Sequence, residues 1–365
     1  MPYAILLTME TVFIAMSGGM DSSFTAYLLK QKGYKVVGIT FQLLPESIKS
    51  TKNPKACCST ETIHRAKKIA DDLSIPHYTI NMRKEFDEHV IDNFLNEYSS
   101  GRTPNPCILC NKYIKFLSFP AKALSIGADK IATGHYAIID ESAGHYTIRK
   151  GTDTTKDQSY FLYPIKEELL KHILFPLGTY TKDNLKINTG KLGWNLQNVK
   201  ESQDICFIPE GNYRDFLSNY IKLKEGPVYH TDGTFMGIHN GIHLYTIGQR
   251  RGLNIPYKEP LYVVEIVPDK NTLIVGPKDH LKRKKLVAHS INLFNTTNVT
   301  SGLASGSLSA KIRYRQKEEA CTFNISNDLL YVDFENPLYS ITPGQSVVIY
   351  RNDAIICGGI IRNSE

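Results

Sequence analysis

The chain has little of what membrane-inserted or exported proteins need. No stretch approaches the roughly 18 consecutive apolar residues of a membrane-spanning helix. The first residues, MPYAILLTMETVF, are too short for a secretory signal peptide and have no basic leading segment. They also lack the arginine- and serine-rich character of an organelle transit peptide. We therefore expect a cytoplasmic protein with no membrane partner.

Internal repeats and low-complexity segments are also missing. The composition, 42% hydrophobic and 22% charged, is that of an ordinary globular protein. A length of 365 residues predicts two or three domains. The net charge of +7 is compatible with a polyanionic partner and equally with a slightly basic enzyme.

The cysteines do not have the pattern of a disulfide framework. Their number, seven, is odd, and the expected compartment is reducing, so structural disulfides are not predicted. We expect Cys321 and Cys357, which lie in β-rich sequence, to be core residues. The adjacent Cys57 and Cys58 are expected in a loop without a chemical role. The other cysteines are Cys107, Cys110 and Cys206.

One short stretch, TVFIAMSGGMDSS, predicts an anion site. Residues 11–16 form an apolar strand, and residues 22–32 have the apolar spacing of a helix. Between them, Gly18 and Gly19 allow backbone N–H groups to approach a ligand closely, and the helix directs its positive end to the same place. The loop has no lysine where a triphosphatase loop, GxxxxGK[ST], requires one. Cleavage at the α-phosphate, with pyrophosphate leaving, suits such a loop.

The order of elements predicts the fold. Strands and helices alternate through the first half, which favours an α/β protein with a doubly wound parallel sheet whose ligands bind beyond the carboxyl ends of the strands. After residue 225 the sequence becomes glycine-rich with short strands, and from 286 it is typical of a β-barrel. We predict an ATP-binding catalytic domain at 1–224, a small central β-rich domain at 225–285 and a C-terminal β-barrel domain at 286–365.

The motifs resemble those of a known family. SGGMDSS resembles the loop of the pyrophosphatase-loop ATP enzymes, whose fold is adenine nucleotide alpha hydrolase-like and which adenylylate a substrate oxygen and then displace AMP. Seven further motifs, spread in order over nearly the whole chain, resemble the tRNA-specific 2-thiouridylase family. They are GRTPNPCILCNKYIKF, ATGHYA, KDQSYFLY, LFPLG, SQDICFI, YTIGQRRGL and IRYRQ.

The resemblance implies ATP-dependent conversion of uridine 34, in the tRNA anticodon loop, to 2-thiouridine. It implies ATP and Mg²⁺ as cofactors, and a sulfur donor such as a cysteine desulfurase or a sulfur-relay protein as a partner. The candidate ATP-binding residues are Ala15, Met16, Ser17, Gly18, Gly19, Met20, Asp21, Ser22, Phe41 and Gly134.

Two thiols suit sulfur transfer, one to carry sulfane sulfur and one to accept or resolve it. Cys110 precedes a helical run, and a helix N-terminus lowers a thiol pKa. Cys206 lies in a loop that ends in Pro209 and Gly211, and a loop can move to deliver sulfur. Burial in the core is the alternative for either one. The resemblance implies that Cys110 is the nucleophile, that Cys206 carries the persulfide, and that a Cys110–Cys206 disulfide closes each cycle.

Cys107 departs from several family members, which have aspartate at this position. A thiol suits proton transfer to uridine less well than it suits a soft metal. Cys107, Cys110 and Cys206 could hold three irons of a [4Fe–4S] cluster and leave one iron for sulfide. Zinc would need a fourth ligand that the sequence does not identify. The cluster, which predicts iron in protein prepared without oxygen, and the persulfide relay therefore both stay open.

Candidate tRNA contacts come from three motifs. Lysine suits phosphate, Asp and Gln suit base or ribose edges, and an arginine–aromatic pair suits stacking on a loop base. The alternative for each is a solvated polar face. The candidates are Asn105, Pro106, Cys107, Lys156, Asp157, Gln158, Arg313 and Tyr314.

Two other functions compete with tRNA thiolation. One is a pyrophosphatase-loop synthetase that uses ammonia on a small molecule, although the chain has no N-terminal cysteine glutaminase and the thiols would then have no use. The other is a non-catalytic RNA-binding module, which would release no pyrophosphate from ATP and tRNA.

Overall fold

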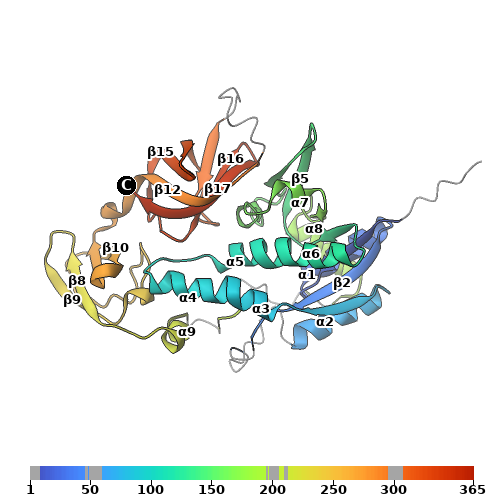
Figure 1. Ribbon diagram of the computed structural model, residues 1–365, viewed down its shortest axis with the longest axis horizontal. Coiled ribbons are helices and arrows are strands. Elements are labelled where there is room, and N and C mark those ends of the chain that lie inside the picture. The colour runs from blue at the N-terminus through green and yellow to red at the C-terminus, as the bar shows by residue number, and fades with distance from the viewer. Residues whose placement is uncertain are drawn as a thin grey trace, which may run out of the picture. The chain divides into compact units, whose positions relative to one another are not determined.

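A computed structural model describes residues 9–45, 48, 60–194, 196, 205–208, 213–294 and 307–365. By its internal contacts the chain divides into two units. Figure 1 shows the helices and strands coloured by residue number. Unit 1 comprises Met1–Asp87 and Cys110–Glu210, and unit 2 comprises Glu88–Leu109 and Gly211–Glu365. Cys57 and Cys58 lie outside the described residues, so their expected loop position stays a prediction.

Unit 1 is built on a parallel five-stranded sheet of order β3-β2-β1-β4-β7. Its strands are β1 (Thr11–Ala15), β2 (Lys35–Gln42), β3 (His77–Asn81), β4 (Lys130–Ala132) and β7 (Ile173–Leu174). Its helices are α1 (Met20–Gln31), α2 (Thr60–Asp72), α3 (Arg83–Phe86), α6 (Phe119–Ser125), α7 (Glu167–Leu170) and α8 (Lys182–Lys191). A π-helical segment (Cys110–Ser118), a 3-10 turn (Ser159–Phe161) and a hairpin of β5 (Ala137–Ser142) and β6 (His145–Lys150) complete it.

The strand order positions the site. From β1 the chain builds outward through β2 and β3, and it then crosses to the other side of β1 to form β4 and β7. The loops after β1 and β4 therefore leave the sheet in opposite directions at adjacent strands, where Ile14 pairs with Ala132. Such a switch point is where open α/β sheets bind ligands.

The core of unit 1 explains why the predicted elements form. Val12 and Ile14 of β1 are fully buried and pack in one cluster with Phe24 and Leu29 of α1 and Leu185 of α8. The predicted strand over 11–16 and helix over 22–32 are thus confirmed, with ends that differ by one or two residues. Strand β4 ends at Ala132, and the chain enters a separate hairpin at Ala137.

Unit 2 contains two antiparallel-rich β structures. A four-stranded sheet of order β10-β11-β8-β9 precedes a barrel of order β12-β15-β14-β13-β16-β17, which closes where β12 pairs with β17. The sheet strands are β8 (Gly226–His230), β9 (Phe235–His239), β10 (Tyr262–Val267) and β11 (Thr272–Gly276). The barrel strands are β12 (Lys282–Leu293), β13 (Leu308–Lys311), β14 (Glu319–Ser326), β15 (Leu329–Tyr339), β16 (Ser346–Arg351) and β17 (Ala354–Ser364). The helices are α4 (Asp92–Ser99), α5 (Pro106–Leu109) and α9 (Tyr213–Tyr220), with 3-10 turns at Ile242–Leu244, Pro268–Lys270 and Lys278–Leu281 and a π-helical turn at Asp87–Ile91.

The predicted fold class is confirmed: a doubly wound parallel sheet, a small central β domain and a C-terminal barrel are all present. The segment 88–109 belongs to unit 2 by its contacts, since Phe94 packs on Phe216 and the Thr103 backbone N–H donates to the Pro343 carbonyl. The domain boundaries at 224/225 and 285/286 stay predictions. In the described part of the chain, no helix has both the length and the apolar character needed to cross a membrane.

Candidate functional site

The loop after β1 has the backbone geometry that close approach demands. Gly18 has φ +66°, and a Cβ there would lie 2.5 Å from the carbonyl oxygen of Thr62. Both facts require glycine at this position. The Arg65 guanidinium Nε donates to the Gly18 carbonyl over 2.7 Å and fixes the loop to α2. The backbone at Gly18 is therefore anchored to α2.

Serine side chains tie the loop to the first turn of α1. The hydroxyls of Ser22 and Ser23 donate to the Gly19 carbonyl over 3.2 and 2.9 Å. The Ser17 backbone N–H donates to the Ser22 hydroxyl over 3.1 Å. Gly19 is the N-cap of α1, so the positive end of the helix dipole faces the loop. The arrangement is that of a phosphate-binding helix terminus.

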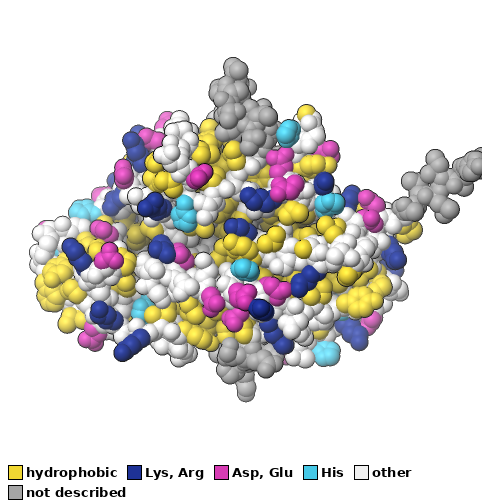
Figure 2. Space-filling model, viewed as in Figure 1, with side chains coloured by type: hydrophobic (Ala, Val, Ile, Leu, Met, Phe, Trp, Pro, Cys, Tyr) yellow, Lys and Arg dark blue, Asp and Glu magenta, His cyan; other side chains and the backbone are white. Residues whose placement is uncertain are grey.

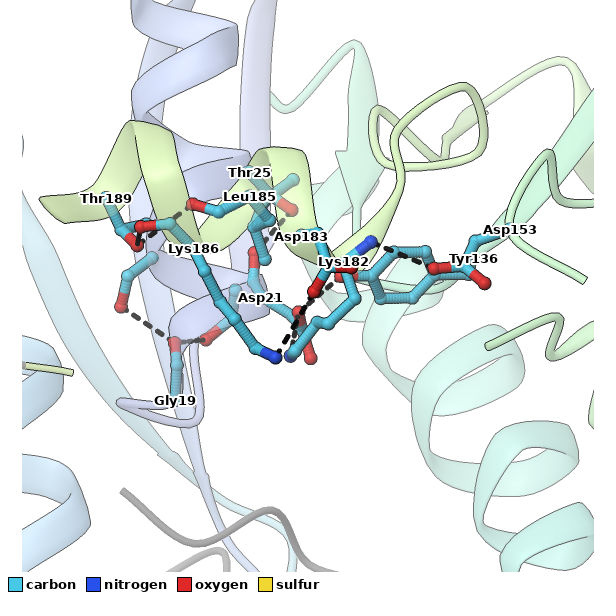
Figure 3. A network of polar contacts seen from close by, with 12 residues as sticks. Gly19, Asp21, Thr25, Tyr136, Asp153, Lys182, Asp183, Leu185, Lys186 and Thr189 are labelled. Atoms are coloured by element: carbon cyan, nitrogen blue, oxygen red, sulfur yellow. Dashed lines mark hydrogen bonds and ion pairs between the residues drawn. The ribbon is translucent and has the colours of Figure 1, made fainter. Parts of the chain in front are cut away.

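Asp21 is the centre of a polar network in this turn. Its Oδ1 accepts hydrogen bonds from the Tyr136 hydroxyl at 2.7 Å and from the Lys182 ammonium at 2.8 Å, as Figure 3 shows. Tyr136 follows β4 and Lys182 begins α8, so the network joins both loops of the switch point to a third segment.

Lys182 is the residue that the sequence interpretation missed. Its side chain is only 8% exposed, against 36% for that of Asp21. Its backbone N–H donates to Asp153 over 2.9 Å, and Thr181 is the N-cap of its helix. A lysine in the first turn of a helix lies in an unfavourable dipole field. That placement, after a threonine N-cap, is the one signal in the sequence that could have drawn attention to it.

Gly134 packs against the phosphate loop itself. A Cβ at this position would lie 3.0 Å from the carbonyl carbon of Asp21 and from the backbone nitrogen of Ser22. The glycine therefore allows the loop after β4 to contact the first turn of α1. Phe41, at the end of β2, is buried and packs edge-on against Phe119 with ring centroids 5.0 Å apart. Adenine contact by Gly134 and Phe41 stays a prediction.

His135 is a buried, uncharged histidine. Its Nδ1 hydrogen-bonds the Thr133 hydroxyl at 2.7 Å, and its ring packs against Phe116 and Phe175 with centroids 5.8 Å away. Burial, helped by nearby Lys115, holds the pKa of the His135 imidazole well below its usual range. His135 therefore supplies packing at neutral pH and no positive charge for phosphate.

The neutral state of His135 predicts acid sensitivity. The unfolded chain binds a proton at this side chain near pH 6.5 and the folded protein only well below it, so stability falls as the pH drops below 6.5. A proton that binds only to the unfolded chain lowers the free energy of unfolding by up to about 1.4 kcal/mol per pH unit. We expect urea denaturation between pH 7.5 and 5 to show this loss, and His135→Gln to reduce its slope by one proton. An unchanged slope in His135→Gln would contradict the assignment.

The two candidate sulfur-transfer thiols both lie in unit 1 and are half-buried. Cys110 is the first residue of the π-helical segment, a feature common at functional sites. Cys206 lies in a turn next to Phe207, which is buried against Phe86 with centroids 5.9 Å apart. Phe207 anchors the turn, and Cys206 itself is half-buried. Their catalytic roles stay predictions.

The helix at Cys110 does not begin where the sequence indicated. Pro106 is the first residue of α5, and Asn105 caps it by accepting a hydrogen bond from the Ile108 backbone N–H at 3.4 Å. Cys107, not Cys110, therefore lies in the first helical turn. The prediction that a helix N-terminus follows Cys110 is wrong, because the Asn105–Pro106 start signal overrides the apolar periodicity that begins later.

The other described cysteines are core residues, as expected. Cys357 is fully buried and Cys321 is 8% exposed, and both pack inside the barrel. Burial raises the pKa of the Cys321 thiol to about 12 and raises that of Cys357 as well. Neither thiol is therefore available as a nucleophile at neutral pH. Among the described residues, no three His, Cys, Asp or Glu side chains are grouped so that they could hold a metal ion.

In unit 1, two candidate tRNA contacts have intramolecular partners. The buried Asp157 carboxylate accepts hydrogen bonds from the backbone N–H groups of Gly151 and Ser159 and from the Ser159 hydroxyl. The Gln158 side-chain oxygen accepts from the Tyr136 backbone N–H over 3.1 Å. These two residues organise the loop beside the phosphate site. Lys156 is half-buried, and tRNA contact by all three stays a prediction.

In unit 2, the remaining candidates occupy varied settings. Pro106 is buried, Asn105 is half-buried and Cys107 is exposed. The Arg313 guanidinium donates to the Ser340 carbonyl and to the Thr342 hydroxyl, and neighbouring Tyr314 is half-buried. Figure 2 shows basic, acidic and apolar side chains intermixed on the face in view. Charge on that face therefore does not locate a nucleic-acid contact by itself.

The fold and the loop together define the class: a nucleotide-binding α/β protein with its anion site at the switch point of a parallel sheet. Family models match the whole described architecture. They are a tRNA methyl transferase HUP domain at residues 10–210, a tRNA methyl transferase PRC-barrel domain at 214–277 and an aminomethyltransferase beta-barrel domain at 283–361.

Curated relatives match over nearly full length. The chain is 43% identical to tRNA-specific 2-thiouridylase MnmA of Halothermothrix orenii, over 98% of this chain and 100% of that protein. It is 44% identical to tRNA-specific 2-thiouridylase MnmA 1 of Caldanaerobacter subterraneus, over 96% and 97%. It is 41% identical to tRNA-specific 2-thiouridylase MnmA of Clostridioides difficile, over 97% of this chain and 99% of that protein. The chain therefore belongs to the tRNA-specific 2-thiouridylase family.

Proposed function

We propose that this protein is an ATP-dependent sulfurtransferase that converts uridine 34 of tRNA to 2-thiouridine. One observation carries the proposal: a hydrogen-bonded phosphate loop with a paired acid and lysine lies in the same unit as two half-buried thiols, Cys110 and Cys206. Membership of a family whose members are titled 2-thiouridylases supports the same substrate.

The first step activates the base. The O2 oxygen of uracil attacks the α-phosphorus of ATP, the bond to the bridging oxygen breaks, and pyrophosphate leaves with its electron pair while the uracil N3 proton is lost. The loop amides and the α1 terminus stabilise the charge that develops on the phosphates. Mg²⁺ would be held by the Asp21 carboxylate, a hard oxygen ligand, and would neutralise phosphate charge.

The second step delivers sulfur. The terminal sulfur of a Cys206 persulfide attacks C2, the C2–O bond breaks, and AMP leaves. The Cys110 thiolate then attacks the Cys206 Sγ, which frees 2-thiouridine and leaves a Cys110–Cys206 disulfide. Two thiols are oxidised and the sulfane sulfur is reduced, so each cycle needs an external dithiol reductant and a persulfide donor protein.

The proposal is tested with purified protein, ATP, a persulfide donor and a tRNA transcript. We expect pyrophosphate release and 2-thiouridine from a transcript with uridine at position 34, and neither from one with cytidine there. Pyrophosphate release with ammonia and a small acceptor instead of tRNA would favour the synthetase. Binding of tRNA without pyrophosphate release would favour a non-catalytic module.

Iron content separates the relay from a cluster on Cys107, Cys110 and Cys206. The relay predicts that protein purified without oxygen is active when free of iron, and that Cys107→Ser keeps its activity. The measurements are iron and sulfide analysis beside nucleoside analysis. Stoichiometric iron that Cys107→Ser loses together with activity would establish the cluster instead.

A further inference from the structure

We propose that Lys182 binds the polyphosphate of ATP, and that it leaves Asp21 to do so when the nucleotide arrives. The proposal rests on the use of ATP in the proposed function and assigns to this lysine the cation that the loop sequence lacks. Lys182 lies 161 residues after Asp21, so only the fold brings the two together.

Because Lys182 is buried, its ammonium needs an anionic partner both before and after ATP binds. A side chain exposed by only 8% has left most of its hydration behind, and an unpaired ammonium in that position would be costly. Asp21 provides the charge at 2.8 Å and is itself 36% exposed. The pair is thus covered at its lysine end and accessible at its carboxylate end, in the turn where a phosphate would enter.

The position of Lys182 argues for a ligand beyond this carboxylate. It is the first residue of α8, where the helix dipole disfavours a cation. Thr181 and Asp153 fix the backbone there, so the placement does not result from a frayed end. A polyphosphate, with several negative charges, would offset the dipole far better than one carboxylate does.

The exchange of partners is chemically balanced. When ATP binds, the ammonium turns from the Asp21 Oδ1 to a phosphate oxygen, which a flexible lysine stem allows. The carboxylate keeps the Tyr136 hydroxyl at 2.7 Å and becomes available to a divalent cation. No proton moves: the ion pair of Lys182 with Asp21 is replaced by a lysine–phosphate pair and a carboxylate–cation pair.

A structural ion pair is the competing explanation. Leu185 of α8 packs in the same core cluster as Phe24 of α1, so the bridge could simply fasten the two helices. Binding of two nucleotide probes separates these explanations, since only ATP carries the phosphates that Lys182 would contact. Binding of both nucleotide probes is measured without tRNA. The test of Lys182 therefore does not depend on whether the protein thiolates tRNA.

The experiment compares Lys182→Met with Lys186→Met by calorimetry with ATP and with adenosine. Lys186, one turn along α8, pairs with Asp183 and is 54% exposed, so it is a matched control. Losing a charge-assisted contact predicts about a tenfold or greater drop in ATP affinity for Lys182→Met. We expect its adenosine affinity to stay within about twofold, Lys182→Arg to keep part of the ATP affinity, and Lys186→Met to match the parent protein.

Two results would overturn the proposal: an unchanged ATP affinity in Lys182→Met, or equal losses for ATP and adenosine. If Lys182→Met does not fold, the double variant Asp21→Asn/Lys182→Met removes both charges and restores neutrality. Measured without divalent cations, the double variant should still bind ATP more weakly than the parent protein does. Full recovery of ATP affinity in the double variant would show that the pair is structural.

Discussion

Alanine at Cys110 or at Cys206 should eliminate 2-thiouridine formation. Each thiol has a separate role in the proposed relay, one carrying sulfur and one resolving the mixed disulfide, so neither can replace the other. Nucleoside analysis of tRNA after reaction with ATP and a persulfide donor measures the loss. Cys321→Ala is the control, because Cys321 lies in the barrel core and burial raises its pKa to about 12.

The same variants should keep the first half of the reaction. Adenylylation needs the phosphate loop and not the sulfur, so pyrophosphate release with tRNA should persist in Cys110→Ala and Cys206→Ala. Its disappearance would show that the thiols also build the ATP site. Thiolation that survives in either variant would refute the relay.

Removal of the Asp21 carboxylate should abolish pyrophosphate release. In Asp21→Ala the Tyr136 hydroxyl and the Lys182 ammonium lose their common acceptor, and Mg²⁺ loses its expected ligand. A charged group in a preorganised phosphate site contributes about a hundredfold or more to the rate. Pyrophosphate release from ATP and tRNA measures the effect, and Asp183→Ala, at a side chain that is 87% exposed, is the control on α8.

A folding defect can be separated from this loss. Asp21→Ala removes the ion-pair partner of a nearly buried ammonium, so the melting temperature of the variant should fall. Adding Lys182→Met removes that charge and should restore the melting temperature without restoring pyrophosphate release. Normal release by Asp21→Ala would exclude the carboxylate from the chemistry.

The phosphate loop was predictable because its information is local. An apolar strand, a glycine turn and a largely buried helix follow one another within residues 11–32, so the pattern is contained in neighbouring residues. The alternation of strands and helices similarly predicts the parallel sheet and its ligand edge. The change in composition after residue 225 predicts the two β structures.

Interpretations that needed a partner distant in the chain were less complete. The sequence analysis did not predict the hairpin β5–β6. Polar residues expected to face RNA proved to have intramolecular partners, as Asp157 does in its loop. The start of α5 was placed too late because the cap at Asn105 lies outside the apolar pattern.

The sequence by itself determined the class of fold, the phosphate loop, the thiols and the family, because these depend on neighbouring residues or on ordered motifs. Only the tertiary structure decided which side chains meet. The crossover from β3 to β4 places the 133–136 loop beside α1, and α8 then brings Lys182 to Asp21. Such contacts depend on strand order and core packing, which join residues 115 and 161 positions apart and leave no periodic trace in the sequence.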